Sequence, residues 1–174
     1  MSIHPEHPFL PPEDERDPVR RLRGRLGGTV TLWAAGEAAA RAGLTVSSRM
    51  VAAGEPAHAL ALLDPDSDLA QALRASQRCV LQLLEWRHRD VADAFAGAPA
   101  PGGPFTRGSW EQTDWGPRLL DAPAWAGGRL ADAREVGWSL LVDVVLETVE
   151  VGEEADPLEH RRGRYLHRSG GAAR

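Results

Sequence analysis

The chain has 174 residues, 43% of them hydrophobic, which suits one domain with a full core and leaves little room for a second. Its formal net charge of −5 argues against a nucleic-acid-binding surface, which would need clustered basic residues. The sequence shows no signal peptide and no segment as long and apolar as a membrane span, and its single cysteine, Cys79, has no disulfide partner within the chain. We therefore expect a cytoplasmic protein.

The two ends of the chain differ in composition from the rest. Residues 1–18 are rich in proline and acidic side chains and poor in apolar ones, which predicts a flexible N-terminal arm. Residues 19–168 form the expected domain, and residues 169–174 are expected to be a disordered tail. His4 and His7 lack further ligands at a useful spacing, so we predict no metal site.

The first third of the domain contains one predicted helix and two predicted strands. Residues 19–26 have apolar side chains at helical spacing among arginines, which predicts a short amphipathic helix packed on the domain. Residues 29–33 alternate and are rich in β-branched and aromatic side chains, so we expect a strand, followed by a loop at 34–42. Residues 43–48 predict a second strand, and residues 49–53 continue in an extended conformation.

The middle of the chain predicts two strands, each followed by a short helix. Residues 56–64 predict a strand, and the polar residues 66–68 supply an N-cap and first-turn acids for a helix over 69–74. Residues 79–84 are a short continuous apolar run, typical of a buried strand. Residues 88–95 predict the second helix.

The last third begins with a stretch of proline, glycine and polar residues at 98–117, which predicts a long loop. Trp110 and Trp115 in this loop could line a cleft, close over a partner subunit, or pin the loop to the core. Extended segments follow at 124–130 and at 136–151. Strands at this frequency, joined by short helices and turns, predict a mainly β fold, a closed antiparallel barrel.

Small polar residues at the end of the second predicted strand make a candidate binding site. The hydroxyls of Thr45, Ser47 and Ser48 lie close together in the sequence, and hydroxyls with free main-chain N–H groups are a common way to hold a phosphate. The alternative is that these side chains only end a strand and satisfy a turn through hydrogen bonds to the backbone. His58 and His88 lie within a predicted strand and at a helix start, and we expect both to be structural or surface residues.

The order of several motifs resembles the flavin reductase-like family, the FMN-binding split barrels. The matching pieces are Thr-Val-Ser-Ser at 45–48, a strand, turn and helix step at 63–67, Asp-x-Ala-x-x-Phe-Ala-Gly at 90–97, and Arg-Gly-Arg-Tyr at 162–165. Together they extend over residues 26–165, most of the chain. The resemblance implies an FMN-binding split barrel, a Greek-key-like antiparallel barrel with short helices.

The same resemblance implies a flavin site formed by two loops. The first, lying along the flavin and its phosphate, consists of Thr45, Val46, Ser47 and Ser48. The second contains Asp64 and Ser67, of which the hydroxyl of Ser67 and the amides at the helix start would face the phosphate. Because Asp64 would repel a phosphate, we expect it to bind a ribityl hydroxyl or to form the turn.

The sequence departs from the family pattern at two informative positions. Most family members have an aromatic or apolar residue where Arg49 stands. Active reductases commonly carry Gly-Asp-His-Thr before the last long strand, whereas this chain has Val-Gly-Trp-Ser at 136–139, with Trp138 at the histidine position. An indole can stack but presents no second titratable nitrogen, so this change affects nicotinamide-dependent turnover more than flavin binding. Trp138 could lie beside the flavin or point into the core beside Leu140 and Val142.

By this resemblance the expected protein is a flavin reductase that binds FMN, or FAD, and transfers hydride to it from NAD(P)H. It would form a homodimer that shares the flavin site, which Trp110, Trp115 and Trp125 would also favour as surplus aromatic surface. A flavin-dependent monooxygenase is the expected partner for the reduced flavin, and neither nucleic acid nor membrane is involved. The alternative is a flavin carrier, or a non-enzymatic split barrel, without efficient NAD(P)H oxidation.

Overall fold

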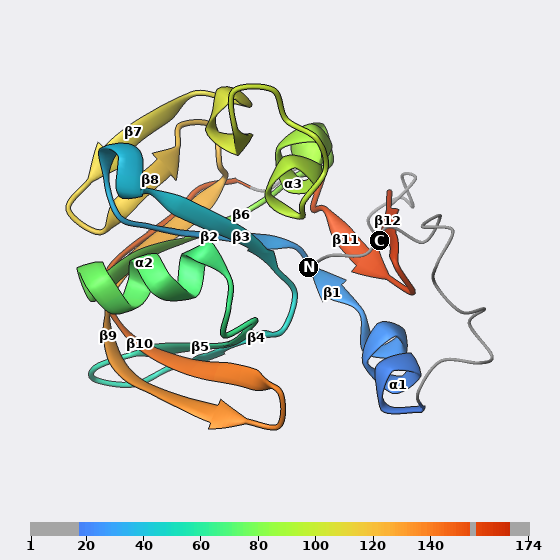
Figure 1. Cartoon of the computed structure of the whole chain (residues 1–174), viewed down its shortest axis with the longest axis horizontal. Coiled ribbons are helices and arrows are strands. Elements are labelled where there is room, and N and C mark those ends of the chain that lie inside the picture. Colours follow the sequence, from blue (N-terminus) through green and yellow to red (C-terminus); the bar gives the residue numbers. More distant parts are fainter. Residues whose placement is uncertain (1–17, 154–155, 168–174) are drawn as a thin grey trace.

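The computed structural model describes residues 18–153 and 156–167. The predicted arm, apart from Pro18, and the predicted tail therefore lie outside the described residues, and so do His4 and His7. The described chain is mainly β with short helices, as predicted (Figure 1).

Seven antiparallel strands form one curled sheet. In spatial order they are β3 (Ala42–Val46), β2 (Thr31–Ala35), β6 (Arg78–Leu83), β9 (Ala124–Val136), β10 (Ser139–Val151), β5 (His58–Leu63) and β4 (Arg49–Ala52). The two edge strands, β3 and β4, are consecutive in the chain and are joined by residues 47–48 alone. The sheet is thus a half-barrel that is open between its two edges. This confirms the split-barrel prediction, whereas the closed barrel expected from the frequency of strands is wrong.

The concave side of the sheet is filled by helix α2 (Asp68–Ser76). Leu69 and Leu73 of α2 belong to the same buried cluster as Trp33 on β2 and Val142 on β10. Figure 1 shows α2 between β2–β3 and the strands β5, β9 and β10. The helix predicted over 69–74 is confirmed and extends by one residue at its start and two at its end.

A second apolar cluster covers the outer face of the sheet. Leu32 on β2 packs there with Leu119 on β8 (Gly116–Leu119) and with Phe95 on α3 (Arg89–Phe95), while β7 (Trp110–Thr113) pairs with β8. Three 3-10 turns lie in the connections, η2 (Ala38–Ala40), η3 (Trp86–His88) and η4 (Pro104–Thr106).

The loop predicted for residues 98–117 is wrong in its second half, where β7 and the start of β8 form a hairpin. Composition suggested a loop because glycine and proline disfavour strands. The hairpin forms because it packs closely on β2: at Gly116 an added Cβ would lie 3.0 Å from the carbonyl oxygen of Ala34.

The tryptophans of this segment pin it to the domain, which was one of the three interpretations. Trp110 packs against Phe95 at 5.5 Å between ring centroids. Trp115 lies over β9 and donates its indole N–H to Glu147 Oε2 at 2.7 Å. Trp125 is buried, and Trp110 and Trp115 are half-buried. These rings therefore do not supply the surplus aromatic surface that we expected a second subunit to cover.

Helix α1 (Pro18–Leu26) forms as predicted but does not pack on the barrel. Val19, Leu22 and Leu26 are between 60% and 76% exposed. The helix is held instead by a small sheet of β1 (Gly28–Thr29), β11 (Glu159–Arg161) and β12 (Arg164–Leu166), where the N–H of Arg162 donates to Gly24 O at 2.9 Å. Figure 1 shows α1 and this sheet to one side of the barrel.

The late strands differ from the prediction in their bounds. Strand β9 continues to Val136, beyond the predicted end at residue 130, and β10 starts at Ser139 after a two-residue turn at Gly137–Trp138. Residues 131–135 were missed because they include charged side chains in an exposed region of the strand, so no buried face produces the alternating pattern.

Cys79 is buried in the barrel core, and burial raises the pKa of its thiol to about 12. A thiol with so high a pKa stays protonated at neutral pH and is a poor nucleophile. Within residues 18–153 and 156–167, no helix has the length and apolar character needed to cross a membrane.

We predict that Gly127→Ala destabilises the protein, because the added Cβ would lie 2.4 Å from Cδ2 of Trp115 and would push the indole off β9. The expected loss is about 1–3 kcal/mol, the usual cost of overpacking. Thermal unfolding followed by tryptophan fluorescence measures it. The matched control is Gly24→Ala on α1, where the nearest atom would be 3.8 Å away, and there we expect no loss. Equal unfolding temperatures for the Gly127 variant and the wild type would contradict this packing.

Candidate functional site

The register of the sheet brings three loops to one end of the barrel. Leu63 at the end of β5 lies opposite Leu140 near the start of β10, and neighbouring strands are about 4.8 Å apart. The turn at residues 64–67, which follows β5, therefore starts beside the turn at 137–138, which precedes β10. The corner at residues 47–48 lies on the other side of β5, because Leu62 N–H donates to Ser48 O at 3.1 Å. The two predicted flavin loops and the Trp138 turn thus share one end of the molecule.

Two of the three candidate hydroxyls at the corner already donate to the backbone. Ser48 Oγ donates to Leu62 O at 2.8 Å, and Thr45 Oγ1 donates to Ala92 O on α3 at 3.1 Å. A hydroxyl carries a single proton, so both can accept a further hydrogen bond but neither can donate to a phosphate without breaking its present bond. Ser47 is exposed, and its hydroxyl has no partner among the described residues. Ser47 is therefore the one hydroxyl of the three that is ready to donate.

A buried polar chain behind the corner was missed by the sequence analysis. Thr31 Oγ1 donates to Val46 O at 2.6 Å and accepts from the indole N–H of Trp33 at 3.2 Å, and both side chains are fully buried. Val46 is itself buried, so it presents its backbone to the corner. The sequence did contain one signal for this contact: side chains alternate between the two faces of a strand, so Thr31 and Trp33 of β2 lie on the same face.

The turn at residues 64–67 is built by its own polar side chains. Asp64 Oδ1 accepts from Asp66 N–H at 2.9 Å, and this hydrogen bond lowers the pKa of the Asp64 carboxyl. Ser67 Oγ donates to Asp64 O at 2.7 Å and accepts from Ala70 N–H at 3.2 Å, which makes Ser67 the N-cap of α2. The turn-forming role expected of Asp64 and the predicted N-cap are confirmed. The second loop consequently carries a negative charge at neutral pH.

Trp138 occupies the tip of the β9–β10 hairpin. It is 97% exposed, so the interpretation that it points into the core beside Leu140 and Val142 is wrong. Its neighbour Gly137 has a φ of +58°, which suits the first position of a tight hairpin turn and directs the next side chain outward. An exposed indole at this end of the barrel is free to contact a bound ligand or another protein surface.

Arg49 stands at the corner, immediately after Ser48. Its side chain is half-buried, and Nη2 donates to Thr29 O on β1 at 3.2 Å. The neighbouring Gly28 faces the corner, since an added Cβ there would lie 3.9 Å from Ser47 O. The sequence analysis recorded Arg49 only as a departure from the family pattern.

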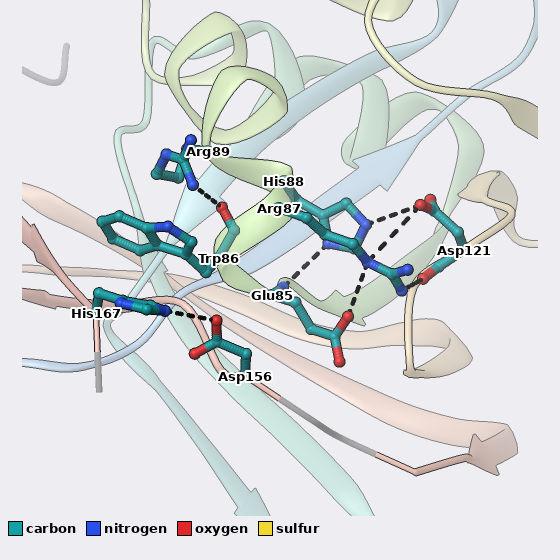
Figure 2. Close-up of polar contacts among 8 residues, drawn as sticks. All are labelled: Glu85, Trp86, Arg87, His88, Arg89, Asp121, Asp156 and His167. Carbon is teal, nitrogen blue, oxygen red and sulfur yellow. Dashed lines mark hydrogen bonds and ion pairs between the residues drawn. The ribbon is translucent and has the colours of Figure 1, made fainter. Parts of the chain in front are cut away.

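His88 is a structural residue, as expected. It is 4% exposed, and its Nδ1 accepts from the backbone N–H of Glu85 at 3.0 Å, so the neutral ring carries its proton on Nε2 (Figure 2). Nε2 lies 3.1 Å from Asp121 Oδ2, at a hydrogen-bond distance but outside hydrogen-bond angles. The guanidinium of Arg87 lies near the carboxylates of Glu85 and Asp121, with Nε 2.8 Å from Glu85 Oε2. The contacts tie η3 to the turn before β9.

Trp86, which precedes Arg87, contacts the C-terminal segment of residues 156–167. Trp86 lies between the guanidinium of Arg89, 4.4 Å from the ring centroid, and the imidazole of His167, at 4.6 Å (Figure 2). His167 also pairs with Asp156 at 2.8 Å. These stacked rings hold residues 156–167 against the domain.

His58 is also structural. It lies on β5, and its Nδ1 is 2.6 Å from Asp143 Oδ1 on the neighbouring strand β10, with both side chains about one-third exposed. In the part of the chain that the structure describes, no group of three or more His, Cys, Asp or Glu side chains could hold a metal ion.

Comparison with known proteins identifies related reductases. The chain is 25% identical over 162 residues to the 4-hydroxyphenylacetate 3-monooxygenase reductase component of Pseudomonas aeruginosa, covering 90% of this chain and 93% of the relative. It is 28% identical over 127 residues to the FMN reductase (NADH) RutF of Ancylobacter novellus, covering 72% and 70%.

The fold of the NADH:FAD oxidoreductase SgcE6 of Streptomyces globisporus superposes with a TM-score of 0.80 at 22% identity, covering 94% of this chain and 98% of that one. At this identity the likeness concerns the fold. The family described as the flavin reductase like domain matches residues 23–168, which include β1 to β12 and both candidate loops. The chain is a member of the flavin reductase-like domain family.

Proposed function

We propose that the protein binds FMN in the two loops at residues 45–48 and 64–67 and reduces it with a reduced nicotinamide. The observation that carries this proposal is the convergence of both loops at one barrel end in a chain of this family. Flavin accepts the hydride, so the protein needs to supply position, access and electrostatics and no catalytic triad.

The groups at this end suit the polar parts of FMN. The Ser47 hydroxyl and the backbone N–H groups at the start of α2 can donate to a phosphate. The Asp64 carboxylate, and the lone pairs of the Thr45 and Ser48 oxygens, can accept from ribityl hydroxyls. Donors and acceptors are therefore both present for a phosphorylated polyol. The relatives are named for both FMN and FAD, and we propose FMN as the form that this site holds.

The relatives also suggest the physiological role. One of them is named as the reductase component of a monooxygenase, and we propose that this chain likewise supplies reduced flavin to a partner monooxygenase. A cytoplasmic location is part of the proposal, because the chain has a single, buried cysteine and no need of an oxidising compartment.

Trp138 is the observation that favours a second candidate function. At the position where active reductases carry a histidine, a fully exposed indole could stack on the flavin and crowd the approach of a nicotinamide, which must bring its hydride carbon to about 3–3.5 Å. In that case the protein would bind and carry flavin with slow NAD(P)H oxidation.

We further propose a homodimer, supported by two sets of exposed apolar side chains. The first is the row Val19, Leu22 and Leu26 on α1. The second is at the barrel end that carries the candidate site, where Met50, Leu62 and Trp138 are exposed. Apolar side chains gathered in this way commonly mark a protein interface.

We predict that Ser47→Ala weakens FMN binding, because it removes the uncommitted hydroxyl donor at the corner. The expected loss is about 1.5–3 kcal/mol, the range for hydrogen bonds to charged groups. Titration of the purified protein with FMN, followed by flavin fluorescence, measures it. Ser48→Ala is the comparison: its hydroxyl already donates to Leu62 O, so we expect mainly a loss of stability of about 0.5–1.5 kcal/mol. Unchanged FMN affinity in the Ser47 variant would place the phosphate elsewhere.

We predict that the wild type sediments as a dimer at micromolar concentration and that Leu22→Glu shifts it to monomer, because a charge would replace the centre of the α1 apolar row. Sedimentation velocity measures both. The control is Leu120→Glu, which changes an exposed leucine in the turn after β8, away from both apolar sets, and should leave the dimer intact. A wild-type monomer, or a Leu22→Glu dimer as tight as the wild type, would refute the proposed interface.

We predict that Trp138→His raises the rate of NADH or NADPH oxidation with FMN and increases the fluorescence of bound flavin, because a smaller ring opens the nicotinamide approach and removes a quencher. The unfolding temperature should not change, since Trp138 is 97% exposed among the residues that the structure describes. Steady-state oxidation assays and bound-flavin emission test both effects. If neither rate nor emission changes, Trp138 does not lie beside the flavin.

A further inference from the structure

We propose that Arg49 binds the phosphate of the flavin and so makes the site prefer FMN to unphosphorylated riboflavin. The inference rests on the proposed function, since it assumes a flavin at the corner of residues 45–48, and it assigns a role to a residue at which this chain departs from its family.

The position of Arg49 places its charge at the corner of residues 45–48. Arg49 follows Ser48 directly, and its guanidinium reaches Thr29 on β1 at 3.2 Å. Thr29 follows Gly28, whose open side faces Ser47 O. The guanidinium therefore lies at the corner, next to the backbone segment that carries Ser47, where an anionic group could accept from it.

Within the described part of the chain, the guanidinium has unused donors and no carboxylate partner. Its bond to the Thr29 carbonyl is the one polar contact recorded for it among residues 18–153 and 156–167, and this bond uses one of the five N–H groups of an arginine. A half-buried cation without a carboxylate is poorly compensated. A phosphate matches the remaining N–H groups, because the planar guanidinium can donate two parallel hydrogen bonds to it.

The second loop is rich in acidic side chains, so a bound phosphate needs a cation beside it. Asp64, Asp66 and Asp68 are all exposed around the second loop. The hydrogen bond from Asp66 N–H also lowers the pKa of Asp64, which keeps this carboxylate ionised at neutral pH. The Thr45 and Ser48 protons are already donated to carbonyl groups. Arg49 is the group at the corner whose charge can offset this repulsion.

The test compares two ligands that differ by the phosphate alone. FMN and riboflavin are titrated separately into the wild type, Arg49→Gln and Arg49→Lys, with dissociation constants taken from flavin fluorescence or calorimetry. Glutamine keeps a side-chain N–H for the Thr29 carbonyl while it removes the charge. We expect Arg49→Gln to bind FMN about 10- to 100-fold more weakly, as for a lost charged hydrogen bond, and riboflavin as the wild type does. Arg49→Lys should recover part of the FMN affinity.

The matched control is Arg74→Gln on α2. Arg74 is also exposed near the second loop, with Nη1 3.5 Å from Pro65 O, and its removal changes the net charge of this end equally. We expect the ratio of FMN to riboflavin affinity to stay at the wild-type value in this variant. An equal fall in the Arg74 variant would mean that general charge, and not Arg49, sets the preference.

Two other outcomes separate this inference from the proposed function. If Arg49→Gln weakens FMN and riboflavin alike, Arg49 only braces β1 against the corner, and the inference is overturned while flavin binding stands. The same holds if the wild type binds both ligands equally well. A wild type that binds neither flavin would overturn the proposed function and this inference together.

Discussion

The corner at residues 47–48 is the constraint on which the rest of the structure depends. Strands β3 and β4 are the two edges of a seven-stranded sheet, which would be about 29 Å wide if it were flat. The chain from Val46 to Arg49 can reach about 11 Å. The sheet must therefore curl until its two edges approach each other at this end, and α2 fills the space that the curl encloses. Hydrogen bonds from Thr31 to Val46 and between Ser48 and Leu62 hold the corner in place.

The same curl explains why the candidate site lies where it does. A corner that joins two edges of a sheet comes near the loops that leave β5 and enter β10, because β5 pairs with β4 and β10 pairs with the other side of β5. Most polar groups of the corner and of the 64–67 turn are used to build these loops, as the bonds of Thr45, Ser48 and Asp64 show. The donors left over are the Ser47 hydroxyl, the remaining N–H groups of Arg49 and the amides at the start of α2, and these donors favour an anion.

The exposed apolar surface is not where the aromatic composition suggested. Trp115 and Trp125 pack on their own chain and donate to Glu147 and Glu150, so hydrogen-bonded indoles fasten the β7–β8 hairpin and β9. Exposed apolar surface is found instead on α1 and at the hairpin tip that carries Trp138. Among the residues that the structure describes, no element buries the apolar side chains of these two places.

By itself the sequence determined most strands, α2 and α3, the N-cap at Ser67 and the family, because these depend on periodicity, capping and motifs that are local in the chain. Only the tertiary structure decided the β7–β8 hairpin, the exposure of α1 and of Trp138, and the commitment of the Thr45 and Ser48 protons to Ala92 and Leu62. Each of these depends on a contact, or on the lack of one, between segments far apart in the sequence. The close approach of the hairpin to β2 produces no pattern in the local sequence from which it could be predicted. The same is true of the hydrogen bonds from the Thr45 and Ser48 hydroxyls to carbonyl groups far away in the chain.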